Sequence, residues 1–330
     1  MSNQHLQKGK YAFDIVKCAL PLFVSLLILI QYTFLPNFRN FTVLDRNAPT
    51  AVFFWFSVIL VSIFFVYFVL SFFFLKLRKQ LRHRAPFYSF ALLLLLAYDW
   101  ATLTTGMLPQ PFFPWPDAIL NAIIRDRAIL GISFLHSMRL LFTGYFLGLI
   151  IGVITGIAAG WSAKIRYWVA PVVRLLAAIP PVTWLPIILI VANSLFSGAV
   201  FLIALAVWYP VTQTTMNGVL NIPKSTLEAA KTFGTRPLSM IFKVCLPATL
   251  PSIFQGAIQG MSIACTALII AEMMGVEAGL GWYINWQRGW AEFAGMYAAI
   301  LIICITFLCV NTLLSLLKTY ALPWKKEDAS

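Results

Sequence analysis

Apolar stretches, each long enough for one helix, alternate along the chain with short segments that carry most of the charged residues. A bilayer core about 30 Å thick needs roughly 20 apolar residues per crossing helix. Windows of that size predict eight membrane spans: Ile15–Leu35, Val52–Leu75, Phe87–Leu103, Met138–Trp161, Val169–Val191, Ala199–Leu220, Ile253–Met274 and Phe293–Leu317. A Pro-rich strip, Leu108–Pro116, and a short amphipathic run, Asp117–Leu130, are too polar to cross. The pattern therefore predicts an all-α, polytopic transmembrane helical bundle.

Composition excludes a soluble protein. Hydrophobic residues make up 61% of the chain and charged residues only 11%, against roughly 25% charged residues in soluble domains. The net charge of +13 would suggest nucleic acid on a soluble protein. With the N-terminus inside, however, sixteen Lys and Arg residues fall on the inner side of the spans and five on the outer side. This asymmetry predicts two cytoplasmic termini and makes a nucleic-acid partner unnecessary.

The sequence offers no set of residues for catalysis or metal binding. The five cysteines and three histidines form no CxxC motif and no Cys/His cluster, so we expect no metal site and no disulfide framework. No G-x-x-x-x-G-K-[ST] phosphate loop occurs, so the chain cannot hold ATP by that route. We therefore expect a chain without catalytic residues or a cofactor of its own.

The longest interior loop, residues 221–252, has the pattern of a helix, a Gly turn and a second helix. Ser225 and Glu228 have the spacing of a capping box, which predicts a helix start at Ser225. Gly234 is placed to end this helix in a left-handed conformation. Pro237 suits the first turn of the second helix, which we expect to run to about Val244 and to be closed by Leu246-Pro247.

This loop and two other motifs resemble a known family. Glu228-Ala229-Ala230, followed by Gly234, Ile241 and Leu246-Pro247, resembles the EAA loop of ABC importer permeases. The segments Ile179–Pro186, Ala271–Gly275 and Gly279–Gly281 resemble the nitrate/sulfonate/taurine branch of that family. Leu108-Pro109 with Pro111 resembles its outer opening segment. The resemblance extends from about Leu108 to Trp324.

The resemblance implies a type I ABC importer permease core over residues 87–324, with the coupling loop at 221–252. Residues 1–86 would be an added transmembrane hairpin, packed peripherally, with a basic tether, Lys76–Arg84, lying on anionic lipid. Residues 325–330 would be a cytoplasmic tail. The implied location is the bacterial cytoplasmic (inner) membrane.

The resemblance also implies partners. Two permease copies, most simply a homodimer, would form one pathway. Two cytoplasmic ABC ATPase subunits would bind ATP and Mg²⁺, and an extracytoplasmic substrate-binding protein would deliver a small anion or organic solute such as nitrate, a sulfonate or taurine. The residues implied in ATPase coupling are Glu228, Ala229, Ala230, Gly234, Leu246 and Pro247.

Two features could belong to the pathway or its gate. Pro180 and Pro181, and again Pro186, break the fifth span, and Trp184 follows the first break. Broken helices often line translocation sites, although a packing kink is an equal alternative. Glu272 lies near the outer end of the seventh span, where a carboxylate needs a partner or water. It could gate the pathway, make a structural contact, or pair with Arg139 or Arg174.

Other polar and small residues predict helix contacts. Gly144, Gly148, Gly152, Gly156 and Gly160 fall on one face of the fourth span, which favours close packing against another helix over a pathway role. Asp99 ends the third span and is expected at the interface. The run Thr212–Thr215 with Asn217 could line an inner vestibule or hydrogen-bond to neighbouring helices.

An ion-coupled secondary transporter working without an ATPase is the alternative function. That class predicts paired intramembrane acids and bases and visible internal repeats. The spans contain few such charges, and no repeat is evident. The ATP-driven importer is therefore the favoured reading.

Overall fold

A computed structural model describes residues 2–39 and 48–322, and within these ranges the ordered elements are all helical. The expected tail at 325–330 and the outer-side Arg46 lie outside the described residues. The chain forms two compact units. The first holds the residues up to Arg127 together with Gln287–Ala298, and the second holds Ala128–Trp286 and the chain from Ala299 onward.

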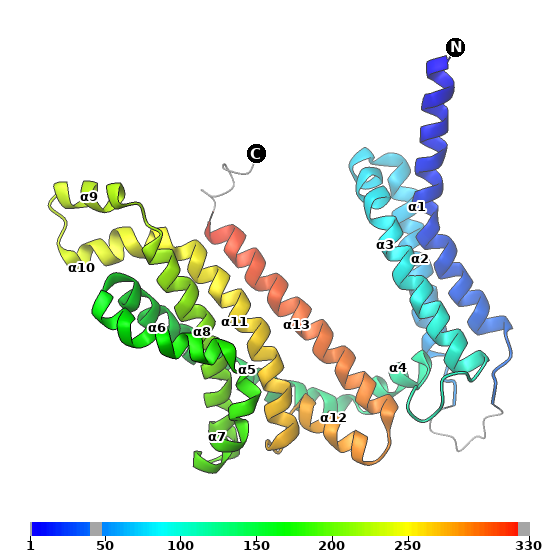
Figure 1. The fold of residues 1–330 in the computed structure, drawn as a ribbon. Helices are drawn as coiled ribbons and strands as arrows, with labels where there is room; N and C mark the ends of the chain where they lie inside the picture. The colour runs from blue at the N-terminus through cyan, green and yellow to red at the C-terminus, as the bar shows by residue number, and fades with distance from the viewer. Residues whose placement is uncertain (1, 40–47, 323–330) are drawn as a thin grey trace. The chain divides into compact units, whose positions relative to one another are not determined.

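Figure 1 labels the helices of both units. The first unit contains α1 (Ser2–Phe34), α2 (Val52–Phe73), α3 (Leu75–Asp99), the π turn η1 (Trp100–Thr104) and α4 (Pro116–Arg125). The second unit contains most of α5 (Arg127–Trp161), then α6 (Ala163–Ala178), the 3-10 turn η2 (Pro181–Trp184), α7 (Leu185–Val191), α8 (Leu195–Leu220), α9 (Lys224–Thr232), α10 (Pro237–Met240), the π turn η3 (Ile241–Cys245) and α11 (Leu246–Met274). Both α12 (Leu280–Gly289) and α13 (Phe293–Ala321) contribute residues to each unit.

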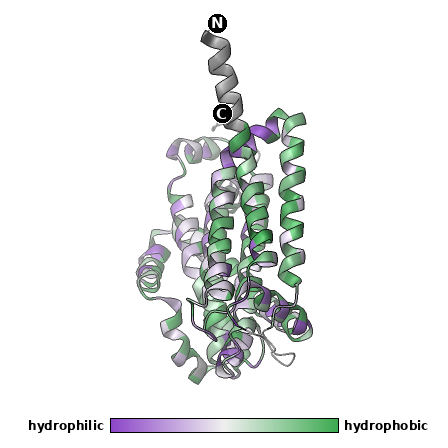
Figure 2. Ribbon diagram, turned by 90° about the vertical axis from the view of Figure 1, so that its right-hand side faces the viewer, coloured by the Kyte–Doolittle hydropathy of each residue, from purple (hydrophilic) through white to green (hydrophobic). Residues whose placement is uncertain are grey.

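The predicted transmembrane bundle is confirmed. Among the described residues, seven helices are long and apolar enough to cross a membrane, and the bent pair Ala163–Ala178 and Pro181–Ile188 makes an eighth if it is one span. Hydrophobic residues run along the length of these helices (Figure 2). The fourth span is longer than predicted, since α5 begins at Arg127 rather than Met138.

In the first unit, α1 packs against both α2 and α3. Val24 and Ile28 of α1, Phe53 of α2 and Leu92 of α3 form a buried cluster. The expected boundary between residues 86 and 87 falls inside α3, and the basic run from Lys76 forms the first turns of that helix.

In the second unit, α8 and α11 pack closely against each other around a continuous apolar core. Leu202, Ile203 and Val207 of α8 are fully buried, and Met261 and Ala264 of α11 are at most 1% exposed. Helices packed this tightly have little freedom to rearrange, because protein interiors are close-packed. Helices α6 and α7 also pack against α8.

The fifth span is sharply broken, with α6 and the η2–α7 segment meeting at 98°. Pro180 disfavours helical geometry at the residue before it, and Ile179 accordingly adopts an extended conformation with ψ 120°. The prediction of a second break at Pro186 is wrong. Pro186 lies in the first turn of α7, where a missing amide leaves no hydrogen bond unmade.

The interior loop differs from expectation at two points. The first helix begins at Lys224 with Pro223 as its N-cap, and no side chain caps it, so the predicted capping box at Ser225 does not form. The second helix does not stop at Leu246-Pro247. At η3 the amide of Leu246 bonds to the carbonyl of Ile241, and this π turn lets Pro247 enter α11 in its first turn without breaking the ladder.

Candidate functional site

The glycine stripe of α5 lies directly against α8. A Cβ atom built at Gly144, Gly148, Gly152, Gly156 or Gly160 would lie 2.5–2.8 Å from the Cβ of Ile203, Val207, Val211, Thr215 or Val219, respectively. The facing residues of α8 are also four apart, so the two rows meet along more than four helical turns. Glycine is required here because any larger side chain would push the two backbones apart.

Polar groups reinforce the same contact. The hydroxyls of Thr155 on α5 and Thr212 on α8 lie 2.9 Å apart, and the indole of Trp208 donates to Thr155 Oγ1 at 3.0 Å. Thr212 also donates to the carbonyl of Gly152 at 3.3 Å. Within the polar run of α8, Thr212 therefore faces a neighbouring helix, whereas Gln213, Thr214 and Asn217 line a groove on the other side.

Glu272 holds the turn between α11 and α12 against α5. Its Oε1 accepts a hydrogen bond from Ser137 Oγ at 2.7 Å, and its Oε2 accepts one from the amide of Gly281 at 2.8 Å. Ser137 Oγ in turn accepts from the amide of Leu280 at 2.9 Å. Glu272 is only 2% exposed, so these donors replace the water that a buried carboxylate would otherwise need.

Two glycines make room for this carboxylate. Gly279 has φ +134°, and a Cβ there would collide with the carboxylate of Glu272; a Cβ at Gly281 would lie 2.8 Å from Glu272 Cβ. Neither Arg139 nor Arg174 forms an ion pair with Glu272 in the described part of the chain, so the suggested pairing does not occur. Arg139 instead lies over the ring of Phe196, 5.3 Å from its centroid.

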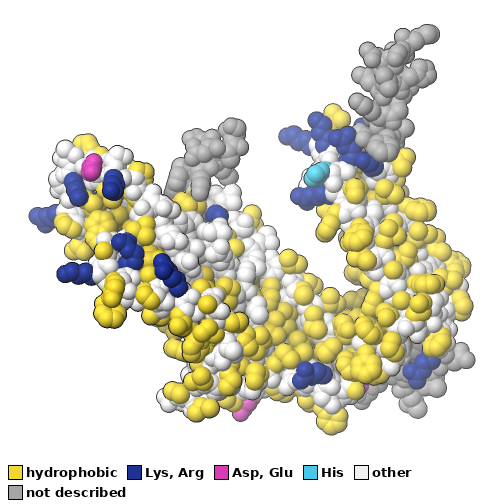
Figure 3. All heavy atoms as spheres, viewed as in Figure 1, with side chains coloured by type: hydrophobic (Ala, Val, Ile, Leu, Met, Phe, Trp, Pro, Cys, Tyr) yellow, Lys and Arg dark blue, Asp and Glu magenta, His cyan; other side chains and the backbone are white. Residues whose placement is uncertain are grey.

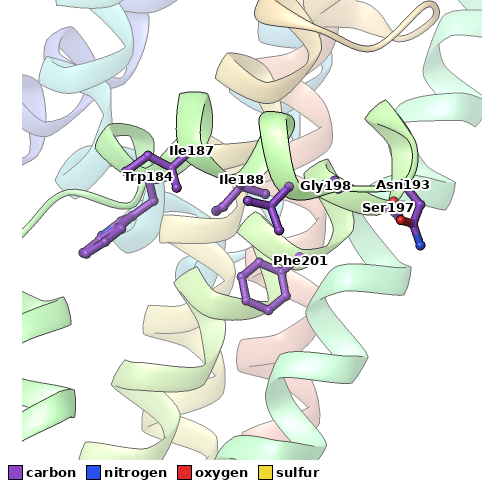
Figure 4. Close-up of a pocket in the computed structure, with 9 residues that line it drawn as sticks. Trp184, Ile187, Ile188, Asn193, Ser197, Gly198 and Phe201 are labelled. Carbon is purple, nitrogen blue, oxygen red and sulfur yellow. The ribbon is translucent and has the colours of Figure 1, made fainter.

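The broken span creates a pocket of about 520 Å³ between α7 and the first turns of α8. Its walls include Trp184, Ile188, Asn193, Ser197 and Phe201 (Figure 4). Most of this lining is apolar. Pro180 and Pro181 lie at the bend itself, where the carbonyl of Pro180 accepts from the amide of Thr183 at 3.1 Å. The geometry thus brings Trp184 to a cavity but leaves Glu272 in a separate hydrogen-bond network.

The first unit contains two buried acids whose importance the sequence did not reveal. Asp117, in the first turn of α4, is fully buried and accepts from the amides of Thr50 and Phe53 at 2.5 and 2.7 Å. It therefore caps the N-terminus of α2, whose own N-cap residue, Ala51, supplies no side-chain bond. The sequence offered only two signals for this cap: an acidic residue in the first turn of α4, and an apolar helix, α2, with no capping side chain of its own.

Asp99, at the end of α3, is the second of these acids. It is 1% exposed, and Gln31 of α1 donates to its Oδ2 at 3.0 Å. Together with the Asp117 cap, this bond ties both helices of the N-terminal hairpin to α3 and α4. The hairpin is therefore an integral part of the first unit.

The interior loop is ordered at its turn but has an exposed surface. The amide of Thr235 bonds to the carbonyl of Ala230, and the amide of Gly234 bonds to that of Lys231 at 2.9 Å. With Gly234 at φ +73°, these bonds form a complete Schellman motif. No residue of α9 is buried, and Phe233 at its end is 89% exposed. Of the other coupling candidates, Glu228 and Ala229 are exposed, and Leu246 and Pro247 are the first two residues of α11.

Relatives with known names match most of the chain. It is 29% identical over 225 residues to an aliphatic sulfonates transport permease protein of Bacillus subtilis, covering 67% of this chain and 81% of the relative. It is 25% identical over 264 residues to the taurine transport system permease protein of Escherichia coli, covering 77% of this chain and 94% of the relative. These matches confirm the resemblance to the sulfonate and taurine branch.

A solved structure and a family match agree with the helical arrangement. The MetNI methionine ABC transporter in an inward facing conformation aligns with a TM-score of 0.51 at 19% identity, over 60% of this chain and 98% of the MetNI chain, so the two share a fold. The family described as binding-protein-dependent transport system inner membrane component matches residues 144–326. The chain thus belongs to the family of binding-protein-dependent transport system inner membrane components.

Proposed function

We propose that this permease subunit of an ABC importer is driven by a separate ATPase that docks on the loop carrying α9. The proposal extends the family assignment to particular residues: Glu228, Ala229, Ala230 and Gly234 in the first helix and turn, and Leu246 and Pro247 where α11 begins. ATP and Mg²⁺ would be held by that partner, which leaves the present chain to form the pathway.

One observation carries this proposal: a Schellman motif closes the C-terminus of α9 although none of its residues is buried in the chain. A nine-residue helix gains too little from its own hydrogen bonds to be stable alone. The exposed ring of Phe233 at its end supplies an apolar anchor of the kind found at interface centres. Lys224, Lys231, Arg236 and Lys243 are exposed around it, and Figure 3 shows basic side chains gathered over this part of the second unit. The surface therefore fits a partner groove that is apolar within and acidic at its rim.

The remaining partners follow from the family name. A second copy of the chain would complete the pathway, and a substrate-binding protein would deliver the solute on the side opposite α9. The basic residues around α9 favour the cytoplasm for this loop and for both termini. A secondary transporter would have no use for an ordered helix of this kind with no buried residue.

The substrate class is proposed from the relatives. The names of both relatives described above specify a solute with a sulfonate group, and a small oxyanion of this kind is the solute that we assign to the present chain. The specificity would reside largely in the external binding protein. The pathway would have only to admit such an anion and release it.

The decisive experiment is purification of the chain together with the ATPase and binding protein encoded beside it. We expect the ATPase to co-purify and uptake into proteoliposomes to require ATP hydrolysis. Uptake that persists with a catalytically dead ATPase would refute the proposal in favour of an ion-coupled transporter.

The Schellman turn offers a second test with a matched control. Gly234→Val places a β-branched residue at φ +73°, a conformation costing such residues roughly 1–2 kcal/mol. Gly234→Asn instead places there a residue that tolerates a positive φ. Because no atom lies within 4 Å of a Cβ at this position, both variants test the turn without steric clash. We expect the Val variant, and not the Asn variant, to lose ATP-dependent uptake. Equal uptake by the two variants would show that the turn is not needed for coupling.

A further inference from the structure

A row of uncharged polar side chains lies exposed on the membrane-spanning parts of α8 and α11. On each helix they are three or four residues apart, so they share one face. They are Gln213 and Asn217 on α8, and Gln255, Gln259, Ser262 and Thr266 on α11. Exposed positions elsewhere on membrane-spanning helices such as α2 are mostly apolar, as lipid requires.

A groove of about 540 Å³ runs between the two helices along this row. Gln213, Thr214 and Asn217 contribute to one wall, and Gln259 and Ser262 to the other. It lies wholly within the second unit and is distinct from the pocket beside Trp184. Carboxamide groups from two different helices thus converge on one space large enough for a small solute.

The hydrogen bonding of these residues is incomplete. The carboxamides of Gln213, Asn217 and Gln259 have no partner among residues 2–39 and 48–322, whereas Thr214 donates to the carbonyl of Pro210 at 2.8 Å. Exposing an unpaired amide to hydrocarbon costs roughly 2–7 kcal/mol. Three such groups side by side would be costly against lipid, and water or a polar solute in the groove would satisfy them.

The charges around the groove have one sign. Helices α8 and α13 contain no Asp or Glu, and the one acid of α11, Glu272, is bonded to Ser137 and Gly281 at the outer end of that helix. Near the opposite end, Lys318 of α13 donates to Gln255 Oε1 at 3.2 Å. An anion in the groove would meet amide donors and a nearby cation, with no carboxylate to repel it.

We propose that this groove lines the substrate pathway and passes small oxyanions such as sulfonates, an assignment that rests on the proposed function. The carboxamide N–H groups of Gln213, Asn217 and Gln259 replace part of the water shell of the anion. Because these donors carry no full charge, they bind it loosely enough to let it leave, as passage through a pathway requires. Trp184 and Glu272, the candidates from the sequence, have no part in this contact.

The test is cysteine labelling by two methanethiosulfonate reagents of similar size, one with a sulfonate tail and one with a trimethylammonium tail. The five native cysteines are first replaced, and retained co-purification of the ATPase shows that the complex is intact. Gln213→Cys, Asn217→Cys and Gln259→Cys are then labelled in membrane vesicles carrying the whole complex. Ile305→Cys on α13, where the native side chain is 61% exposed, is the lipid-facing control.

We expect the three groove cysteines to react faster than the control. With each rate divided by that of the same reagent with a free thiol in solution, the sulfonate reagent should be about tenfold faster than the cationic one, as local potential concentrates anions. Adding Gln259→Glu to the Gln213→Cys variant should reverse this preference, whereas Gln259→Leu should not. Rates equal to those at Ile305→Cys, or a preference for the cation, would overturn the inference. Because ATPase co-purification is measured separately, that result would leave the proposed function standing.

Discussion

The contact between α5 and α8 permits a quantitative test by Gly152→Ala. The added methyl would lie 2.8 Å from Val211 Cβ, 2.9 Å from Val211 Cγ1 and 3.2 Å from the carbonyl oxygen of Trp208. Carbon atoms pack best at about 3.5–4.0 Å, so α5 and α8 must separate by a sizeable fraction of an ångström. Overpacking of this kind typically costs about 1–3 kcal/mol.

The same helix supplies the control. At Gly131 of α5 no heavy atom lies within 4 Å of a built Cβ, so Gly131→Ala adds the same methyl to open space. Both variants gain about 1 kcal/mol of helix propensity, and this gain cancels in the comparison. We therefore expect Gly152→Ala to be less stable than Gly131→Ala by about 1–3 kcal/mol, the overpacking term alone.

The measurement is reversible denaturant unfolding in detergent micelles, followed by tryptophan fluorescence, with both variants purified identically. A lower free energy of unfolding for Gly152→Ala than for Gly131→Ala supports close backbone contact between α5 and α8. If Gly152→Ala proves as stable as Gly131→Ala, the row of glycines is not needed for approach of the two helices, and the packing argument fails.

Three further outcomes follow from the buried hydrogen bonds. Glu272→Gln replaces one acceptor oxygen with an NH₂ group, so we expect a loss of about 1–3 kcal/mol in the same unfolding assay, and no loss would show the carboxylate to be dispensable. Gly279→Ala should destabilise the protein because its methyl meets the carboxylate of Glu272. Gly289→Ala, with nothing within 4 Å of the added Cβ, should be neutral or stabilising. Equal stability of the two variants would contradict a tight turn between α11 and α12. Asp117→Ala should cost about 0.5–2 kcal/mol as a lost N-cap, and Asp117→Asn should cost less. Hydrogen exchange at the first turn of α2 should be faster in Asp117→Ala than in Asp117→Asn.

The sequence was sufficient for features that depend on local chemistry or on helix periodicity. The spans follow from the length of apolar runs, the bend at Pro180 from the restriction that proline imposes on Ile179, and the left-handed turn from Gly234. The glycine row also lies on one face, as the four-residue spacing requires. Each of these features is encoded within one or two helical turns of the chain.

Features that depend on distant residues could not be predicted. Asp117 is paired with amides more than sixty residues away, and no local pattern marks it as a cap for α2. The need of Glu272 for a partner could be read from the sequence, but its actual donors, Ser137 and the amide of Gly281, could not. The continuation of α11 through Pro247 depends on the π turn before it, a rearrangement of the ladder that propensity does not indicate.

The buried bonds of Asp117 and Asp99 have a consequence for how the chain can be shortened. Removing residues 1–86 would delete Gln31, Thr50 and Phe53, and so would leave two carboxylates without their donors inside an apolar unit. The N-terminal hairpin therefore cannot be deleted without destabilising the rest of the first unit, whatever its contribution to transport. A minimal version of this permease would need both acids replaced by apolar residues in the same step, which makes the loss of the hairpin a several-mutation event rather than a single truncation.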